Sequence, residues 1–492
     1  MQKTNTHLKM LASRQALNFC LSLLFCLSSF PLTCFSQSDE ASSLRLQEQD
    51  RQISDEENRQ LKVTERAPLA GAEKDFALDY GIWLMADYRH YNNIDNDKQV
   101  EDWIKDIYTA DARLWVNAMY YDMFMIYGRL KTTYIWKPNV SSAYNGIGDD
   151  LEGPKVDSLY GQLFLHNRYN IPLSVRVGRQ FLTLGRGITY SDMHDGVEMR
   201  YQIGKRFNVK TFVSKTKEFD NNIDYSVPGY TDEGDRHFFG AEASFIAGNM
   251  VFYAYTLVQR DLSHENPTDH TQNYTYDSEY VGIGGLGRSG DLSYWFEVIK
   301  EYGKSYTDAA QTNLARKDID AWAFDIGAKY SIDAYSHPKV DVEMAYGSGD
   351  KERSRVTNTS GGNVSGRDTN FMYFGVFNAG YALAPRLSNM YIYKVEASCK
   401  PIEFMPYIGE NVAVGAKYFL YRKDEKLGGI YDVDATESDP DIGQELDFYL
   451  HWKVYENFYF SAKYGIFYPG AAYPHGRRTP SEYFYARVRM IV

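Results

Sequence analysis

Basic side chains recur in stretches where polar and apolar residues alternate. In the segment Leu173–Val177, for example, apolar residues alternate with Ser174 and Arg176. Successive side chains of a β-strand point to opposite faces, so this pattern places cations on one face and apolar groups on the other. Cations gathered on a shared inner wall would attract anions, because low-dielectric walls focus their field. The cationic residues expected on such a wall are Arg89, Arg113, Arg129, Lys131, Arg176, Arg200, Lys463, Arg487 and Arg489.

Arg179 is the ambiguous member of this set. Strict alternation from Arg176 turns Arg179 toward the apolar face, near the rim of the wall. A local bulge at Gly178 would turn it inward instead. We include Arg179 among the pore residues, and both orientations remain open from the residues alone.

Acidic residues are expected on the opposite side of the wall. If the last strand lies beside the first, the bases form one sector and the acids face it. One close charge pair at an effective dielectric near 20 is worth about 4 kcal/mol before desolvation. Two interpretations follow: a sector that selects polyanions, or a mixed-charge wall whose arginines pair with facing acids. The acidic candidates are Glu297, Asp325, Asp341, Glu343, Glu445 and Asp447.

The elements that carry these residues are long alternating segments. Leu78–Arg89, Tyr108–Ala118 and Phe124–Tyr134 each alternate for about ten residues or more, the length that a tilted strand needs to cross a bilayer. Short turns such as Tyr121-Asp122 alternate with long polar loops such as Lys137–Lys155. The pattern predicts an all-β fold: a transmembrane antiparallel β-barrel over residues 76–492, with short periplasmic turns and long extracellular loops.

Parity decides how one ambiguous segment is assigned. Counting Phe371–Phe377 as a strand would leave the carboxyl terminus outside, so we assign it to a long outer loop, Ser348–Ser388, and predict roughly eighteen strands. Exposed to water, its apolar patch would be unfavourable. The patch either folds into the lumen as a constriction or packs on neighbouring loops. Its aromatic residues are Phe371, Tyr373, Phe374 and Phe377.

The amino-terminal region is expected to direct export. Basic residues precede the apolar run Ala16–Leu27, and small residues follow, as in a secretory signal peptide over residues 1–36; a membrane anchor is the alternative. Residues 37–75 are polar and predict a periplasmic lead, flexible or partly helical, of undetermined role. Removal of residues 1–36 would leave Cys399 without a cysteine partner.

Composition excludes two classes of protein. A mean hydropathy of −0.48 argues against a bundle of transmembrane helices. The 42 Tyr, 27 Phe and 38 Gly favour strands and tight turns. Residues 37–492 contain 50 basic and 65 acidic residues, a net charge of −15, which argues against a nucleic-acid partner.

Two further motifs carry weaker signals. Ser191, Asp192, His194 and Asp195 offer the groups of a hydrolase, but such close neighbours in one outer loop rarely converge. Asp432, Asp434 and Asp439 resemble a calcium loop without the spacing of a helix-loop-helix site, which favours an exposed acidic loop. We expect no metal site and no catalytic residue.

Phe76–Val492 resembles the alginate-export family of outer-membrane barrels. The residues that carry the resemblance are Arg176–Gln180 with Gly185–Gly187, Gly347–Asp350, Leu387–Asn389, and Ile442–Asp447 with Lys463–Gly470. The resemblance implies a single-chain barrel that passes an acidic polysaccharide such as alginate through an arginine-lined pore. It also implies pore roles for Arg176, Arg179 and Arg200.

The sequence therefore predicts a passive channel in the bacterial outer membrane for an anionic solute, with an acidic polysaccharide such as alginate as the expected cargo. A general small-solute porin is the alternative; a hydrolase and an adhesive barrel are less favoured. We expect no cofactor and a monomer surrounded by outer-membrane lipid, with periplasmic export proteins as further partners.

Overall fold

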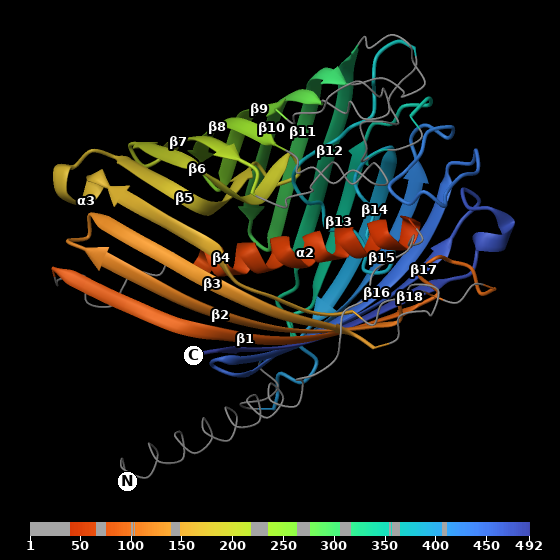
Figure 1. Ribbon diagram of the computed structural model, residues 1–492, viewed down its shortest axis with the longest axis horizontal. Helices are drawn as coiled ribbons and strands as arrows, with labels where there is room; N and C mark the ends of the chain where they lie inside the picture. The colour runs from red at the N-terminus through yellow and green to blue at the C-terminus, as the bar shows by residue number, and fades with distance from the viewer. Residues whose placement is uncertain are drawn as a thin grey trace.

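The computed structural model describes residues 40–64, 75–99, 102, 104–138, 148–217, 235–262, 276–305, 316–353, 356, 365–405 and 411–492. The predicted signal peptide lies outside these residues, as do parts of the predicted lead and of several loops. Within them, eighteen strands form one sheet in which each strand pairs with the next and β1 also pairs with β18. The sheet is therefore a closed barrel (Figure 1).

All of the strand pairings are antiparallel. The strands are β1 (Phe76–Asn92), β2 (Asp106–Tyr120), β3 (Phe124–Lys137), β4 (Gly148–Phe164), β5 (Leu173–Leu184), β6 (Tyr190–Ile203), β7 (Phe207–Lys215), β8 (Arg236–Ala247), β9 (Met250–Asp261), β10 (Asp277–Ser289), β11 (Leu292–Ser305), β12 (Lys317–Ser331), β13 (Lys339–Gly347), β14 (Met390–Cys399), β15 (Val412–Lys423), β16 (Asp441–Tyr455), β17 (Phe458–Pro469) and β18 (Ser481–Ile491).

The predicted fold class and strand number are confirmed. Parity excluded Phe371–Phe377 correctly, since no named strand lies between β13 and β14 among the described residues. Two boundaries differ: β6 begins at Tyr190, so Ser191–Asp195 lie on a strand and not in an outer loop, and β4 begins at Gly148 and not after Lys155. Pairing with β3 continues past Lys131 through two register shifts, so this outer hairpin is longer than its polar sequence indicated.

The two faces of the strands differ as the alternation predicted. On β1, Leu78 and Ile82 are exposed on the outer face, whereas Trp83, Asp87 and Arg89 are buried on the inner face. An apolar outer face suits lipid, because hydrocarbon cannot hydrogen-bond to polar groups. The polar and charged side chains therefore line the lumen.

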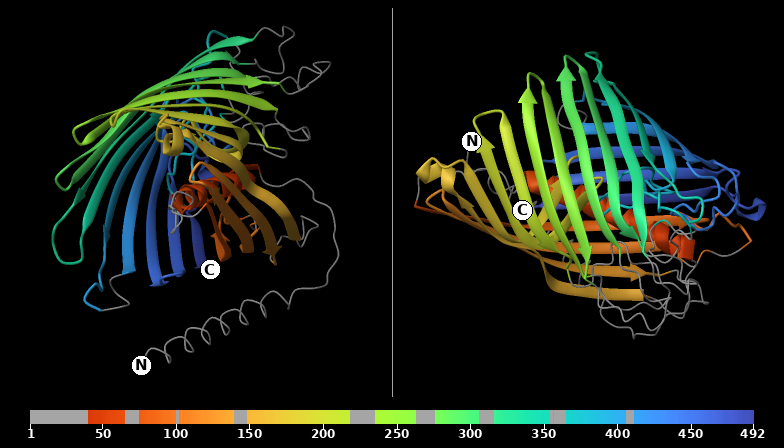
Figure 2. Two further views of the ribbon diagram at one scale, coloured as in Figure 1. Left: turned by 90° about the vertical axis from the view of Figure 1, so that its left-hand side faces the viewer. Right: turned by 90° about the horizontal axis from the view of Figure 1, so that it is seen from above.

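Helix α2 (Glu40–Thr64) lies within the curve of the sheet, in both the side view and the rotated views (Figures 1 and 2). It lies in the segment for which the sequence predicted a polar periplasmic lead, and its residues contact lumen-facing side chains of the strands. Its buried positions include Arg45, Glu48, Asp55 and Glu57. A helix in a charged lumen needs polar groups on its buried face, which explains the missing apolar stripe. Two short helices, α3 (Leu165–Tyr169) and η3 (His475–Arg477), lie in connections. Among the described residues, no helix is long and apolar enough to cross a membrane.

The connection between β13 and β14 also enters the barrel. Phe371, Tyr373, Phe374 and Phe377 are all buried in the main core cluster. Phe374 forms an isolated parallel bridge with Tyr190 at the start of β6, and its ring lies 5.0 Å from that of Phe238 on β8. The apolar patch thus packs on the barrel wall.

Candidate functional site: a basic sector facing a lumenal helix

Barrel closure brings the basic residues of both chain ends together. Because β18 pairs with both β17 and β1, the sector continues across β17, β18, β1, β2 and β3. Arg487 lies opposite Asp87, and Arg113 lies opposite Lys131. Like charges directly opposite each other destabilise a sheet unless anions compensate them. The sector therefore requires carboxylates.

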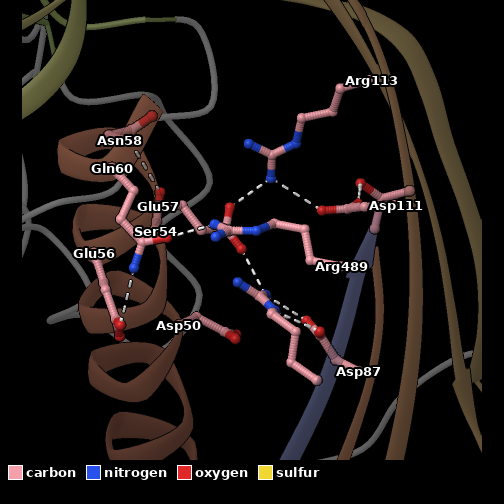
Figure 3. A network of polar contacts seen from close by, with 12 residues as sticks. Asp50, Ser54, Glu56, Glu57, Asn58, Gln60, Asp87, Asp111, Arg113 and Arg489 are labelled. Atoms are coloured by element: carbon pink, nitrogen blue, oxygen red, sulfur yellow. Dashed lines mark hydrogen bonds and ion pairs between the residues drawn. The ribbon is translucent and has the colours of Figure 1, made fainter. Parts of the chain in front are cut away.

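Helix α2 supplies carboxylates to this sector, and Figure 3 shows Glu57 of the helix pointing at Arg113 of β2. Glu57 lies 2.5 Å from guanidinium nitrogens of both Arg113 and Arg487. Glu56 pairs with Lys463 at 2.7 Å. Nearer the amino end of the helix, Asp50 pairs with Arg89 at 2.5 Å. Arg489 donates a hydrogen bond to the side chain of Gln60.

The Glu57 contact is the most enclosed of these. The side chains of Arg113 and Glu57 are only 2% and 9% exposed. Burial alone would raise the pKa of the Glu57 carboxyl, but Arg487 and Arg113 outweigh it and lower that pKa to about 2. Burial likewise opposes ionisation of Glu56, and Lys463 lowers its pKa below the ordinary value. Both carboxyls are therefore charged at neutral pH.

Four other predicted basic residues are held by the wall itself. Arg129 pairs with Asp157 at 2.5 Å, Lys131 with Asp111 at 3.4 Å, and Arg200 with Glu198 at 2.7 Å. Arg176 donates to the Gln162 side chain and lies 4.4 Å from the centre of the Tyr160 ring. These contacts are those of a mixed-charge wall, whereas the contacts with α2 are those of a cationic surface with an acidic segment on it.

Arg179 does not face the lumen. It lies directly opposite Asp195 without a register shift, and two hydrogen bonds of 2.8 Å join the side chains. Val177, two positions before Arg179 on β5, and Val197, on the neighbouring strand β6, are both exposed on the outer face. Gly178 has φ +128°, but this conformation is accommodated within the regular pairing. The inward bulge that we expected is absent, and Arg179 lies on the outer surface.

The acidic residues of the wall pair with a residue that the sequence did not single out. Arg186, in the turn between β5 and β6, pairs with Asp325 at 2.6 Å and with Glu343 at 3.5 Å. Its backbone N–H donates to Glu297. The flanking Gly185 and Gly187 have positive φ values of 51° and 95°, so glycines permit this inward turn. The Gly-Arg-Gly triplet was the available signal.

The β13–β14 connection is fixed to the wall and to α2. The backbone N–H groups of Tyr381, Ala382 and Leu383 all donate to the buried carboxylate of Glu445. Gly375 packs so closely that an added Cβ would lie 1.9 Å from the carbonyl oxygen of Gly187. Arg51 of α2 donates to the Gly375 carbonyl oxygen. The connection and the helix therefore share one interface inside the barrel.

The outer end of α2 is anchored through the candidate calcium loop. Arg45 forms a buried ion pair with Asp432 and donates to the carbonyl oxygen of Ile94 at 2.7 Å. Asp434 pairs with Arg477, and Asp439 accepts the N–H of Asp441. These aspartates hold protein partners, and no group of three or more His, Cys, Asp or Glu residues able to bind a metal occurs in the described chain.

The candidate hydrolase residues do not form a triad. Ser191 donates to Asp55 of α2, and His194 Nδ1 contacts the Tyr190 hydroxyl at 2.6 Å. The distance between His194 Nε2 and the Asp192 carboxylate is 3.8 Å. Ser191 thus serves the docking of α2.

A cavity of about 420 Å³ lies beside α2, against β14–β18 and the β13–β14 connection. Lys417 and Lys463 lie on its strand side, and Glu56 lies on its helix side. Lys417 Nζ is 3.0 Å from the Tyr381 hydroxyl. The cavity is thus lined by both aromatic rings and ammonium groups. The aromatic residues lining it are Tyr381, Tyr449, Tyr483 and Tyr485.

The closed eighteen-stranded barrel, with its apolar exterior and charged lumen, defines an outer-membrane barrel of the channel class. Residues 162–486 match the sequence model of the family described as alginate export. This match covers more than half of the chain, so the chain belongs to the alginate-export family, as its motifs indicated. No match was found among curated proteins.

Several solved structures share the fold. OccK5 (OpdH) and OccK8 (OprE) of Pseudomonas aeruginosa each align with a TM-score of 0.53 at 9% identity, over 84% of this chain and 98% of theirs. OccAB1 of Acinetobacter baumannii aligns with a TM-score of 0.53 at 12% identity, over 84% of this chain and 96% of that chain. At these identities the similarity shows the fold alone.

Proposed function

We propose that this channel passes an anionic solute passively, and that the solute is an acidic polysaccharide such as alginate. One observation supports the proposal above the others: Glu57, Glu56 and Asp50 lie as a row of carboxylates along the basic sector. A surface that binds successive carboxylates of a helix has the chemistry to bind successive carboxylates of a polyuronate.

The aromatic residues next to the sector fit a sugar. Trp83, Trp115, Tyr127 and Tyr160 form a continuous row of rings on β1–β4, with neighbouring centroids 5.3 to 6.5 Å apart. Aromatic faces bind apolar sugar faces, and the adjacent arginines would bind the carboxylates. Family membership supports the same cargo.

The test is ion selectivity and block in planar bilayers. Reversal potentials across a salt gradient measure anion preference, and an oligouronate added to one side measures binding. Because α2 neutralises part of the sector, the measurement includes the double variant Glu56→Gln/Glu57→Gln beside the native chain. At least the variant is expected to prefer anions. It is also expected to be blocked by the oligouronate but not by a neutral oligosaccharide of equal length.

Cation preference without block in both proteins would overturn the proposal. Arg113→Ala in the double-variant background is expected to reduce anion preference. Arg179→Ala serves as the matched control, because it removes the same charge from the outer surface.

The alternative function is a general small-solute porin. The wall-to-wall pairs of Arg129 with Asp157 and of Arg200 with Glu198 favour it, since paired charges impose little selectivity. Equal permeability to neutral and acidic sugars would support this alternative.

A further inference from the structure

Helix α2 is held in the lumen mainly by charge and hydrogen bonding. Leu46 is its one side chain in the buried core cluster, with Ile53 packed against it, among the α2 side chains that the structure describes. Its other barrel contacts include Arg45 to Asp432, Glu57 to Arg113 and Arg487, and Gln49 to the Tyr381 carbonyl oxygen. An interface made of ion pairs can be exchanged for another ligand that supplies equivalent charges.

In the part of the chain that the structure describes, the wall retains carboxylate partners for only two of the four strand cations that pair with α2 carboxylates. Arg487 retains Asp87, and Arg113 retains Asp111, when α2 is disregarded. The ion pairs that Lys463 and Arg89 form are with α2, among the described residues. Removing one partner of an enclosed ion pair is strongly unfavourable unless another ion takes its place. Departure of α2 is therefore favourable only when a second polyanion enters.

The cavity beside α2 offers such a polyanion a first point of contact. It borders Glu56 and Lys463, which are joined at 2.7 Å. Lys417 and the rings of Tyr449 and Tyr485 line the same cavity. An acidic sugar residue bound there could offer its carboxylate to Lys463 in place of Glu56.

We propose that helix α2 is an internal polyanionic ligand of the basic sector, and that an acidic oligosaccharide competes with it for Lys463, Arg113, Arg487 and Arg89, entering from the cavity that Lys417 and Lys463 line. This inference rests on the proposed function and adds an assignment of carboxylate subsites and a means of regulation. The helix keeps the channel occupied until cargo of matching charge displaces it.

The experiment compares the full-length native protein with Glu56→Gln/Glu57→Gln in planar bilayers. Neutralising both carboxylates weakens the internal ligand and raises the fraction of channels whose sector is open to cargo. Apparent affinity follows that fraction, so the concentration of hexauronate for half-block is expected to fall about tenfold. Single-channel conductance is expected to rise as well. Glu456→Gln, an exposed glutamate in the β16–β17 turn, is the matched control and is expected to behave as the native chain.

The outcomes separate the inference from the function on which it rests. Equal half-block in the native protein and the variant, with both selective for anions, would overturn the inference and leave the function standing. If neither the native protein nor the variant selects anions, the proposed function is overturned. Heat-modifiable migration on gels checks that the barrel is folded. If the double variant does not fold, Asp50→Asn replaces it, because the Asp50 side chain is 59% exposed and its loss removes only the partner of Arg89. Asp50→Asn is then expected to be blocked at a lower hexauronate concentration than the native protein. Block at the native concentration would count against the inference.

Discussion

The carboxylate of Glu57 on helix α2 lies 2.5 Å from a guanidinium nitrogen of Arg113 on β2, although 56 positions separate the two residues in the chain. The same carboxylate contacts Arg487 on the last strand. One acidic side chain therefore joins the lumenal helix to β2 and β18, the two strands that flank β1 where the barrel closes. This contact is one of the ion pairs that hold α2 in the lumen and neutralise the basic sector.

Acidification to pH 4 is expected to leave α2 in place. The pKa of Glu57 is lowered to about 2, so its contribution to docking is present above its unfolded pKa and is lost as pH falls through about 2. The difference in conductance between the native protein and Glu57→Gln should therefore stay constant between pH 7 and pH 4 and shrink only on approach to pH 2. A difference that already disappears near pH 4.5 would contradict the docking of an ion-paired Glu57.

Arg45→Met is expected to release the outer end of α2. This change leaves the buried Asp432 without its arginine partner, and breaking such a pair costs about 3–5 kcal/mol. Hydrogen–deuterium exchange of peptides covering residues 40–64 should accelerate by about 100-fold or more. Adding Asp432→Asn removes the uncompensated charge and should restore part of the protection. Unchanged exchange in Arg45→Met would refute the anchoring role.

Arg186→Gln is expected to shift selectivity toward cations. The change removes the positive partner of Asp325 and the more distant of two positive partners of Glu343, which keeps Lys394 at 2.6 Å, so net negative charge appears on the lumenal wall opposite the basic sector. Reversal potentials in asymmetric salt measure the shift. Lys304→Gln is the matched control: it removes one positive charge from a pair with Asp318 whose side chains are both more than half exposed. An unchanged reversal potential in Arg186→Gln would show that this pair lies off the ion path.

Arg179→Gln is expected to leave the reversal potential unchanged. The side chain lies on the outer face with Asp195, away from the lumen. Exposed pairs contribute about 0–1 kcal/mol, so folding should also be nearly unaffected. Arg176→Gln, three positions earlier on the same strand and on the lumenal face, is the comparison. A selectivity change for Arg179→Gln equal to that for Arg176→Gln would place both side chains in the pore.

The sequence by itself determined the barrel. Period two, the length of the alternating segments and the parity of the connections predicted eighteen antiparallel strands, because every lipid-crossing strand must satisfy the same simple geometry. The same alternation placed Arg113 and Arg487 on the inner face. It also turned Arg179 outward, as the structure shows; the pore assignment of Arg179 was wrong because the family motif was preferred to the period.

Only the tertiary structure decided what the basic sector contacts. Helix α2 carries no apolar stripe, because its buried face meets charged side chains, and periodicity analysis detects apolar burial alone. The pairing of Glu57 with Arg113 and Arg487 depends on barrel closure and on the path of the helix through the lumen, which no local pattern encodes. Arg186 likewise reaches Asp325 only because the β5–β6 turn folds inward. Long-range charge pairing is a property of the closed barrel, whereas alternation is a property of each strand.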